Sequence, residues 1–488
     1  MTLAHILIFS FVAILISWLV PAKWRTNALL FISILSIYWL QPASTIRNLD
    51  FWLPTTAILL TVLTWLVSQK HTDSIIKAIS PAITIMVFII FGLSISRFFE
   101  PLCCLTPSKP PQLSSILIYL LFASFLFWII YRIKFIRTHI IHALLLLIIA
   151  LLIIQKSPTL AEYTSAFLRN TTGQDTSLAS ALDISWLGFS YLAFRLLHVL
   201  QDSKTGKYED QSLGNFATYA LFFPTYTAGP IDRSQRFNND LQAIKSYDSD
   251  SSFLERFSNF AKSADFLNGS KRIFTGIFKK FVLADSLALI AINKYNASQI
   301  NESLWVWVLI YAFSLQIYLD FSGYTDVALG IGTLLGFKIP ENFTQPYRKT
   351  NLTTFWNSWH ITLSQWFRAY FFNPLTRWLR SHPGQIPVWV IILSAQLGTM
   401  LLIGLWHGIS WNFAIWGLWH GVGLFIHNRW ADWTRSLPKL LPKTQSAGMI
   451  RNFLGWFITF HYVSLGWVWF ALSDPVQSLS VFQKLFSF

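Results

Sequence analysis

Long apolar runs recur along this chain of 488 residues, and they constrain its fold more than any other feature. A helix needs about 20 mostly apolar residues to cross a bilayer, because backbone polar groups in the hydrocarbon core must be hydrogen-bonded within the segment. Only 12% of the residues are charged, about half the share typical of soluble domains. The pattern predicts an all-α polytopic membrane protein. The expected spans are Leu3–Val20, Asn27–Leu40, Phe51–Val67, Pro81–Ile95, Ile116–Tyr131, Ile140–Ile154, Ile184–Leu200, Trp305–Leu319, Val388–Leu405, Asn412–Phe425 and Phe453–Leu472.

Basic residues lie mostly in short segments between these runs. Lys23 and Arg25 follow the first run, and Lys204 and Lys207 follow the seventh. Because cytoplasmic loops are enriched in Lys and Arg, the alternation predicts an N-terminus outside and the basic loops in the cytoplasm. The net charge of +15 then reflects orientation and contact with anionic lipid. Nucleic acid is not an expected partner, since no basic recognition helix or nucleic-acid module is present.

Three segments do not read as plain spans. Asn215–Pro230 is broken by proline and glycine, so it is either a re-entrant segment buried in protein or an interfacial loop. Asp232–Ser270 is the longest polar stretch and predicts a cytoplasmic loop with amphipathic helices. Thr353–Leu379 carries too many Trp and Arg residues for a lipid-exposed span, and we expect a helix that lies in the interface or is buried. Without internal repeats, the chain is interpreted as one membrane domain, 1–488, with N-terminal helices (1–200), a motif-bearing core (201–430) and a C-terminal helix (431–488).

Ionisable side chains interrupt the apolar sequence between Asp320 and Gly421. Each one at bilayer depth costs roughly 2.5–3.5 kcal/mol on insertion scales, which makes it a candidate for function. Asp320 and Asp326 are expected to orient a pair of helices, to hold a histidine or to line a polar path. Gly323, Gly330 and Gly332 beside them favour close helix packing.

Two histidines are candidates for chemistry. His407 closes an apolar run, and an imidazole with a pKa near 6.5 can take a proton from an alcohol near neutral pH. His360 follows Trp359. The alternatives are a buried structural histidine for His407 and an interfacial one for His360. The His198–Asp202 spacing occurs in some soluble acyltransferases and is interpreted as coincidence. No nucleophile elbow, phosphate loop or zinc signature is present, and the adjacent Cys103 and Cys104 predict neither a disulfide nor a metal site.

Four ordered blocks resemble the membrane-bound O-acyltransferase (MBOAT) family, in the bacterial branch of alginate O-acetylation and teichoic-acid D-alanylation. The resemblance implies a ring of tilted transmembrane helices around a thinned centre, with a through-tunnel. It also implies acyl transfer from a cytoplasmic thioester, carried by CoA or an acyl carrier, to a hydroxyl, without a bound cofactor or metal. The blocks are FPTYTAGPIDR (Phe223–Arg233), DFSGYTDVALGIGTLLGFKIPENFTQPY (Asp320–Tyr347), FWNSWHITLSQWFRAYFFNPL (Phe355–Leu375) and GLWHGISWNFAIWGLWHG (Gly404–Gly421).

Site residues follow from the resemblance position by position. His407 is the expected catalytic base, and His360 is the second family histidine, which positions the donor or shapes the tunnel. The residues expected to bind substrate or line the tunnel are Asp320, Asp326, Trp359, Trp406 and Asn412. The chain departs from the family pattern at Asn357 and Ser358, where arginines are usual, and at Ala369, where an aspartate is usual.

The resemblance and the motif sequences favour a polysaccharide O-acetylation role in the inner (cytoplasmic) membrane. We expect transfer of acetyl to an extracytoplasmic glycan or other alcohol, or to a partner protein, with an exported esterase-like protein as partner. One competing interpretation is a transporter or flippase that uses the histidines and aspartates as a proton or substrate path, although no inverted repeat is detected. Another is a scaffold with an inactive site.

Overall fold

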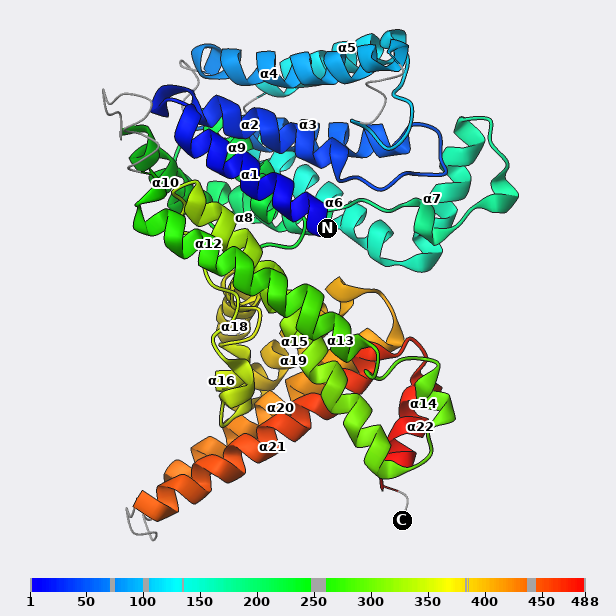
Figure 1. The fold of residues 1–488 in the computed structure, drawn as a ribbon, viewed down its shortest axis with the longest axis vertical. Coiled ribbons are helices and arrows are strands. Elements are labelled where there is room, and N and C mark those ends of the chain that lie inside the picture. Colours follow the sequence, from blue (N-terminus) through cyan, green and yellow to red (C-terminus); the bar gives the residue numbers. More distant parts are fainter. Residues whose placement is uncertain are drawn as a thin grey trace. The chain divides into compact units, whose positions relative to one another are not determined.

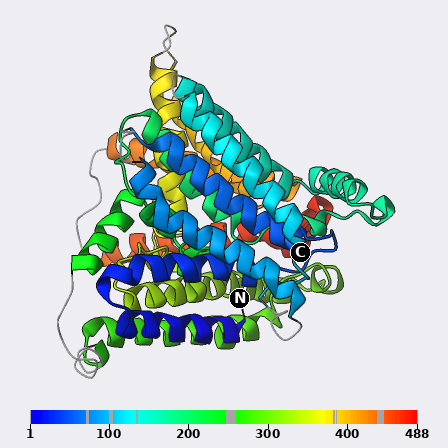
Figure 2. The same ribbon diagram turned by 90° about the horizontal axis from the view of Figure 1, so that it is seen from above.

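The computed structural model describes residues 2–70, 75–99, 105–133, 136–246, 260–381, 384, 386–436 and 445–486 (Figures 1 and 2). These residues form helices and turns and contain no β-strand. The chain divides into two compact units. Unit 1 comprises Met1–Phe274 and Asp326–Pro340, and unit 2 comprises Thr275–Thr325 and Glu341–Phe488.

Seven helical segments among the described residues are long and apolar enough to cross a membrane. Each of them lies within a single unit, except the longest, Ser303–Leu334. The predicted all-helical, multi-pass architecture is confirmed. The segments are Leu49–Ser68, Pro81–Phe98, Leu113–Arg132, Arg137–Lys156, Ser303–Leu334, Val388–His407 and Gly448–Ala471. The through-tunnel expected from the resemblance remains a prediction.

Unit 1 is built from the first ten helices of the chain together with parts of two later ones, α12 and α15. In Figure 1, α4 and α5 lie side by side, and α2 lies beside α9. The helices are α1 (Leu3–Leu19), α2 (Ala22–Trp39), α3 (Leu49–Ser68), α4 (Ile75–Ile95), α5 (Leu113–Arg132), α6 (Arg137–Lys156), α7 (Pro158–Thr171), α8 (Phe189–Lys204), α9 (Leu213–Leu221), α10 (Ser234–Ser246) and α12 (Ala264–Ile277), with short helices at Ser96–Phe98, Thr176–Leu178, Ala181–Asp183 and Phe223–Thr225.

The predicted span Ile184–Leu200 starts too early, because α8 begins only at Phe189. Gly188 precedes it with φ of 76°, a left-handed conformation that glycine adopts without a steric penalty. A side chain there would also collide with Tyr226, whose ring would lie 2.4 Å from the added Cβ. Almost all of α8 is buried, so it serves as a core helix of unit 1.

The broken segment Asn215–Pro230 is buried in unit 1, and Arg195 of α8 satisfies its backbone. The Arg195 guanidinium, 1% exposed, donates to the carbonyl oxygens of Ala220 at 2.9 Å and Thr225 at 2.9 Å. It also donates to the Thr225 hydroxyl at 2.6 Å. Irregular backbone away from water needs such partners, and a buried cation supplies several at once.

A buried ion pair fixes the connection that follows α7. Arg169 contacts Asp183 at 2.9 Å, and both side chains are only 6% exposed. The same carboxylate accepts hydrogen bonds from Ser165 and Thr45, each at 2.6 Å. The pair is therefore fully hydrogen-bonded, which is the condition under which a buried ion pair persists.

The predicted polar stretch Asp232–Ser270 contains α10 and the start of α12, as its amphipathic pattern indicates. Its middle, 247–259, lies outside the described residues, as do Cys103 and Cys104.

Unit 2 begins with a seven-residue π-helix and ends with three long helices and a short C-terminal one. The helix α19 turns back into α20 through only three residues, so the two lie antiparallel (Figure 1). The elements are η7 (Phe278–Ala284), α13 (Asp285–Ala288), α14 (Asn296–Gln299), α15 (Ser303–Leu334, which continues into unit 1), η8 (Pro346–Arg348), α16 (Leu352–Trp356), α17 (Ile361–Phe367), the π-helix η9 (Arg368–Phe372), α18 (Asn373–Arg380), α19 (Val388–His407), α20 (Trp411–Ser436), α21 (Gln445–Ala471) and α22 (Pro475–Phe486).

Two predicted boundaries are wrong in this region. Thr353–Leu379 is not one helix: the chain breaks between α16 and α17, where His360 has a left-handed φ of 42°. The span Trp305–Leu319 ends too early, since α15 runs on through Asp320 and Asp326. Each aspartate has a cationic partner within its own unit, Lys280 for Asp320 and Arg272 for Asp326, so the charges do not end the helix.

Candidate functional site

His407 is the last residue of α19 and lies in an aromatic cluster of unit 2. Its ring centroid is 4.9 Å from that of Phe470, 5.5 Å from Trp416 and 5.9 Å from Phe413. The side chain is partly exposed. Gly408 follows it, and a Cβ there would meet the Phe413 ring at 2.8 Å. The ring of His407 is therefore held by packing yet accessible.

His360 is buried, with 3% of its surface exposed, at the break before α17. Neither of its ring nitrogens has a hydrogen-bond partner in the described part of the chain. Burial lowers the pKa of His360 to about 3, because desolvation disfavours the charged imidazolium. This imidazole is neutral at pH 7, and one of its nitrogens carries a proton that it can donate.

The indole of Trp406, which precedes His407 in the chain, also contacts the ring of His360. Its centroid lies 4.7 Å from the ring of His407 and 6.1 Å from the ring of His360. The predicted pair, far apart in sequence, thus meets at one aromatic side chain.

A paired loop holds His360 in place. The Thr344 amide donates to the Ser358 carbonyl at 3.1 Å, and the Ile361 amide donates to the Asn342 carbonyl at 3.0 Å. The Thr362 hydroxyl donates to Asn342 Oδ1 at 2.6 Å. The residues before and after His360 are thereby fixed, which sustains its left-handed backbone.

Two further predicted residues, Trp359 and Asn412, make packing and hydrogen-bond contacts within unit 2. Trp359 is buried, with its ring stacked on Phe355 and tilted against Trp467. Asn412 donates to the Leu472 carbonyl at 2.7 Å and to the Ser478 hydroxyl at 3.0 Å, which ties α20 to α22.

Each of the two aspartates forms an ion pair with a cation on a neighbouring helical element, and the roles predicted for them remain predictions. Asp326 accepts from Arg272 at 2.9 Å within unit 1. Close glycine contacts accompany this pair: a Cβ on Gly330 would lie 2.7 Å from the Gly269 carbonyl oxygen. In unit 2, Asp320 pairs with Lys280.

His420 is a residue that the sequence pattern did not assign to the site. It is fully buried, its ring lies 5.2 Å from Trp416 and 5.0 Å from Trp356, and neither ring nitrogen has a hydrogen-bond partner among the described residues. Trp416 therefore contacts both His420 and His407. The sequence does carry a signal, since Trp419-His420-Gly421 repeats the tripeptide Trp-His-Gly that contains His407.

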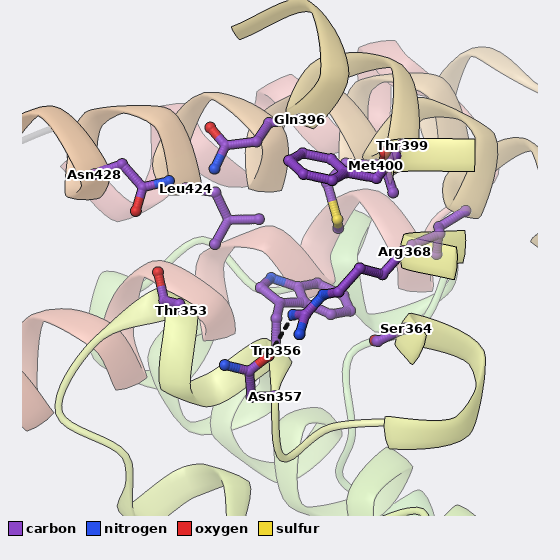
Figure 3. Close-up of a pocket in the computed structure, with 12 residues that line it drawn as sticks. Thr353, Trp356, Asn357, Ser364, Arg368, Gln396, Thr399, Met400, Leu424 and Asn428 are labelled. Carbon is purple, nitrogen blue, oxygen red and sulfur yellow. Dashed lines mark hydrogen bonds between the residues drawn. The ribbon is translucent and has the colours of Figure 1, made fainter. Parts of the chain in front are cut away.

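A narrow hollow of about 140 Å³ adjoins this aromatic cluster (Figure 3). Trp356 and Asn357 form one wall, and Gln396, Leu424 and Asn428 lie opposite them in the view of Figure 3. Among the residues that the structure describes, no group of three or more His, Cys, Asp or Glu side chains is placed to hold a metal ion.

Comparisons with known proteins identify the family to which the chain is similar over most of its length. Residues 6–466 match the model of the family described as MBOAT, membrane-bound O-acyltransferase family. The chain is 31% identical over 296 residues to a teichoic acid D-alanyltransferase of Streptococcus thermophilus, covering 59% of this chain and 68% of the relative. It is 32% identical over 278 residues to a peptidoglycan O-acetyltransferase of Helicobacter pylori, covering 56% of this chain and 47% of the relative. It is also 32% identical over 304 residues to a probable alginate O-acetylase of Pseudomonas aeruginosa, covering 62% of this chain and 52% of the relative. The matched region thus spans about half the length of these last two relatives.

Proposed function

Because this chain belongs to the membrane-bound O-acyltransferase family and is therefore an O-acyltransferase, we propose that it moves a short acyl group, acetyl, from a cytoplasmic thioester to an extracytoplasmic hydroxyl. The acceptor hydroxyl belongs to a polysaccharide, or to a partner protein that completes the transfer. The names of the relatives, which include peptidoglycan and alginate O-acetylating proteins, support a glycan as acceptor. The proposed location is the inner membrane. An exported esterase-like protein is the proposed partner.

The observation that carries the proposal is that the rings of His360 and His407 both contact Trp406. Acyl transfer to an alcohol needs a base for the hydroxyl proton and a polar group that orients the reactants. The two histidines differ in the way these roles require. His407 is partly exposed at the end of α19, whereas His360 is buried and neutral.

The proposed reaction conserves atoms and charge. His407 takes the proton of the acceptor hydroxyl as the oxygen attacks the thioester carbonyl. The carbon–sulfur bond then breaks, an ester forms, and the proton passes from the imidazolium to the departing thiolate. The C-terminal end of α19 carries partial negative charge and favours the transient imidazolium. His360 donates a hydrogen bond that orients the donor.

The test is thiol release from acetyl-CoA by the purified protein in detergent. His407→Ala is expected to lower the rate about 100- to 10,000-fold, the usual contribution of a general base. The matched control is His461→Ala, on α21 of the same unit, whose ring nitrogen bonds the Phe457 carbonyl of its own helix. Both variants must elute from gel filtration as the parent does. Equal activity of parent and folded His407→Ala removes His407 from the base role.

A transporter would move substrate without consuming thioester. Substrate uptake into vesicles that is unaffected by the absence of acyl donor, together with no thiol release, would replace the proposed function with transport.

A further inference from the structure

His420 lies within α20, in the interior of unit 2, and the proposed reaction does not use it. Its side chain has no exposed surface, and neither ring nitrogen has a hydrogen-bond partner among the described residues. Burying an unpaired donor and an unpaired acceptor costs stability, and an apolar side chain of similar size would avoid that cost. A buried polar group that is left unpaired in a folded protein therefore needs an explanation other than stability.

The imidazole of His420 contacts two indoles at steep angles. Its centroid is 5.0 Å from that of Trp356, with the ring planes at 79°, and 5.2 Å from that of Trp416, with the planes at 71°. The two indoles also contact each other, at 5.7 Å and 73°. Aromatic pairs favour such arrangements, because the positive edge of one ring faces the negative surface of the other. Three rings in mutual edge-to-face contact fix one another's orientation.

Each of these indoles supports one of the two histidines of the proposed reaction. Trp416 contacts the ring of His407 at 5.5 Å, with the planes at 86°. Trp356 is the last residue of α16, and His360 follows it four residues later. The ring of His420 therefore contacts one support of His407 and one support of the segment that carries His360.

A second contact holds α16 against the same face of α20. The Nδ1 atom of His427 lies 3.0 Å from the hydroxyl oxygen of Thr353, within hydrogen-bond distance. His427 is seven residues after His420, which places both on one face of the helix. Thr353 and Trp356 both belong to α16. The short helix is thus held at two points, and the point nearer to His360 in the chain is the contact of Trp356 with His420.

Gly466 of α21 leaves the space that the ring of His420 occupies. An ideal Cβ on Gly466 would lie 2.7 Å from Nε2 of His420 and 3.1 Å from its Cε1. Any side chain at position 466 would therefore displace the imidazole. The position of the ring depends on the close approach of α20 and α21 at this glycine.

We propose that His420 is a positioning residue, whose imidazole fixes the indoles of Trp416 and Trp356 and thereby the placement of His407 and of the segment that carries His360. This rests on the function proposed above. His420 transfers no proton in this role and acts only through the two indoles. Its unpaired nitrogens lower stability, and the ring contributes geometry instead.

The test replaces His420 by leucine, an apolar side chain of similar size, and measures thiol release from acetyl-CoA and thermal unfolding in detergent. Because leucine removes the unpaired nitrogens, His420→Leu is expected to unfold at an equal or higher Tm. Its kcat is expected to fall about tenfold or more, since small displacements of reacting groups slow a reaction strongly, while KM for acetyl-CoA stays unchanged. His461→Leu on α21 is the matched control and is expected to keep the parent's kcat. Parent-like kcat in folded His420→Leu overturns the proposal.

A double-mutant cycle tests whether the effect passes through Trp416. If it does, His420→Leu combined with Trp416→Phe lowers kcat no further than the slower of the two single variants, because both changes release the same contact with His407. If the two losses multiply, the residues act independently and the proposal is wrong.

The placement of His407 can also be followed without catalysis, by NMR of protein labelled in its histidine rings. The His407 signal is identified by its absence from His407→Ala. It is expected to shift in His420→Leu and to keep its position in His461→Leu. A shift in a protein whose parent releases no thiol supports the positioning role while the proposed function fails. Thiol release that is lost in His407→Ala but kept in His420→Leu, with an unmoved signal, overturns the positioning role alone.

A second variant covers the case in which His420→Leu does not elute from gel filtration as the parent does. Gly466→Ala leaves His420 in place, but its Cβ displaces the same ring. It is expected to lower kcat and to shift the His407 signal. Parent-like kcat and an unmoved signal in folded Gly466→Ala would contradict the proposal.

Discussion

Replacing Gly417 by alanine tests how closely α19 and α20 must approach each other to place His407. An ideal Cβ on Gly417 would lie 2.4 Å from the carbonyl oxygen of Met400 and 3.0 Å from the Cα of Leu401. These are backbone atoms of α19, so no side-chain rotation relieves the overlap. Ordinary contact begins at 3.4 Å, so the two helices must separate by about 1 Å at the carbonyl.

The magnitudes of three effects decide the outcome. Alanine in place of glycine normally stabilises a helix by about 1 kcal/mol. Overpacking a close contact costs about 1–3 kcal/mol, so the expected net loss of stability is small, about 1 kcal/mol. Catalysis is more sensitive, because misplacing a reacting group by about 1 Å lowers a rate about 100-fold. Since His407 ends α19, Gly417→Ala is expected to reduce activity far more than stability.

The assay pairs thiol release with thermal unfolding in detergent. Gly92→Ala on α4 is the control, because a Cβ there would meet nothing within 4 Å. It is expected to keep full activity and an equal or higher Tm. Parent-like kcat in Gly417→Ala would refute the reasoning, since it would show that the helix contact is not needed to place the histidine.

Three further substitutions address other parts of the molecule. Burial alone raises the pKa of Asp183, but hydrogen bonds from two hydroxyls and Arg169 outweigh it and hold the pKa below its usual value. The pair therefore stabilises the fold above the unfolded-state pKa, about 3.9, and this contribution is lost as the pH falls through the lower folded-state pKa. Asp183→Asn is expected to cost about 3–5 kcal/mol at pH 7 and to flatten the acid side of the Tm–pH curve. Arg195→Met leaves several buried carbonyl oxygens unpaired and is expected to lower the unfolding free energy by at least about 3 kcal/mol in denaturant titration, whereas a loss under about 1 kcal/mol would contradict its bracing role. His360→Asn keeps a neutral hydrogen-bonding side chain that tolerates left-handed backbone, so it is expected to retain more kcat than His407→Asn, and the reverse order would exchange the two roles.

Helical structure was predictable from the sequence because apolar length and composition control it. Every predicted run coincides with a described helix, and most boundaries shift by a few residues. The largest shifts are at α15, which continues past Leu319 through Asp320 and Asp326, and at α20, which continues past Phe425 to Ser436. The sequence could not show that Lys280 and Arg272, far away in the chain, neutralise these charges.

The break at His360 was not predictable from local pattern. Phe355, Trp356 and Trp359 are compatible with a helix, and the residue at φ of 42° is a histidine, not a glycine. The conformation is imposed by hydrogen bonds from the separate loop that contains Asn342 and Thr344. Tertiary contacts of this kind override local propensity and leave no signal in the segment they deform.

The two predicted histidines look alike in sequence, since each follows a tryptophan, and only their surroundings assign them different chemistry. His407 lies at the C-terminal end of a long helix, partly exposed, where a positive charge can form and be stabilised. His360 is enclosed by rings, including Phe321 at 4.7 Å, where a positive charge is disfavoured. His420 shares the Trp-His-Gly tripeptide of His407 but lies in mid-helix with no exposed surface. A motif therefore identifies which side chains are chemically capable, whereas helix position and burial support His407 as the proposed acceptor of the hydroxyl proton.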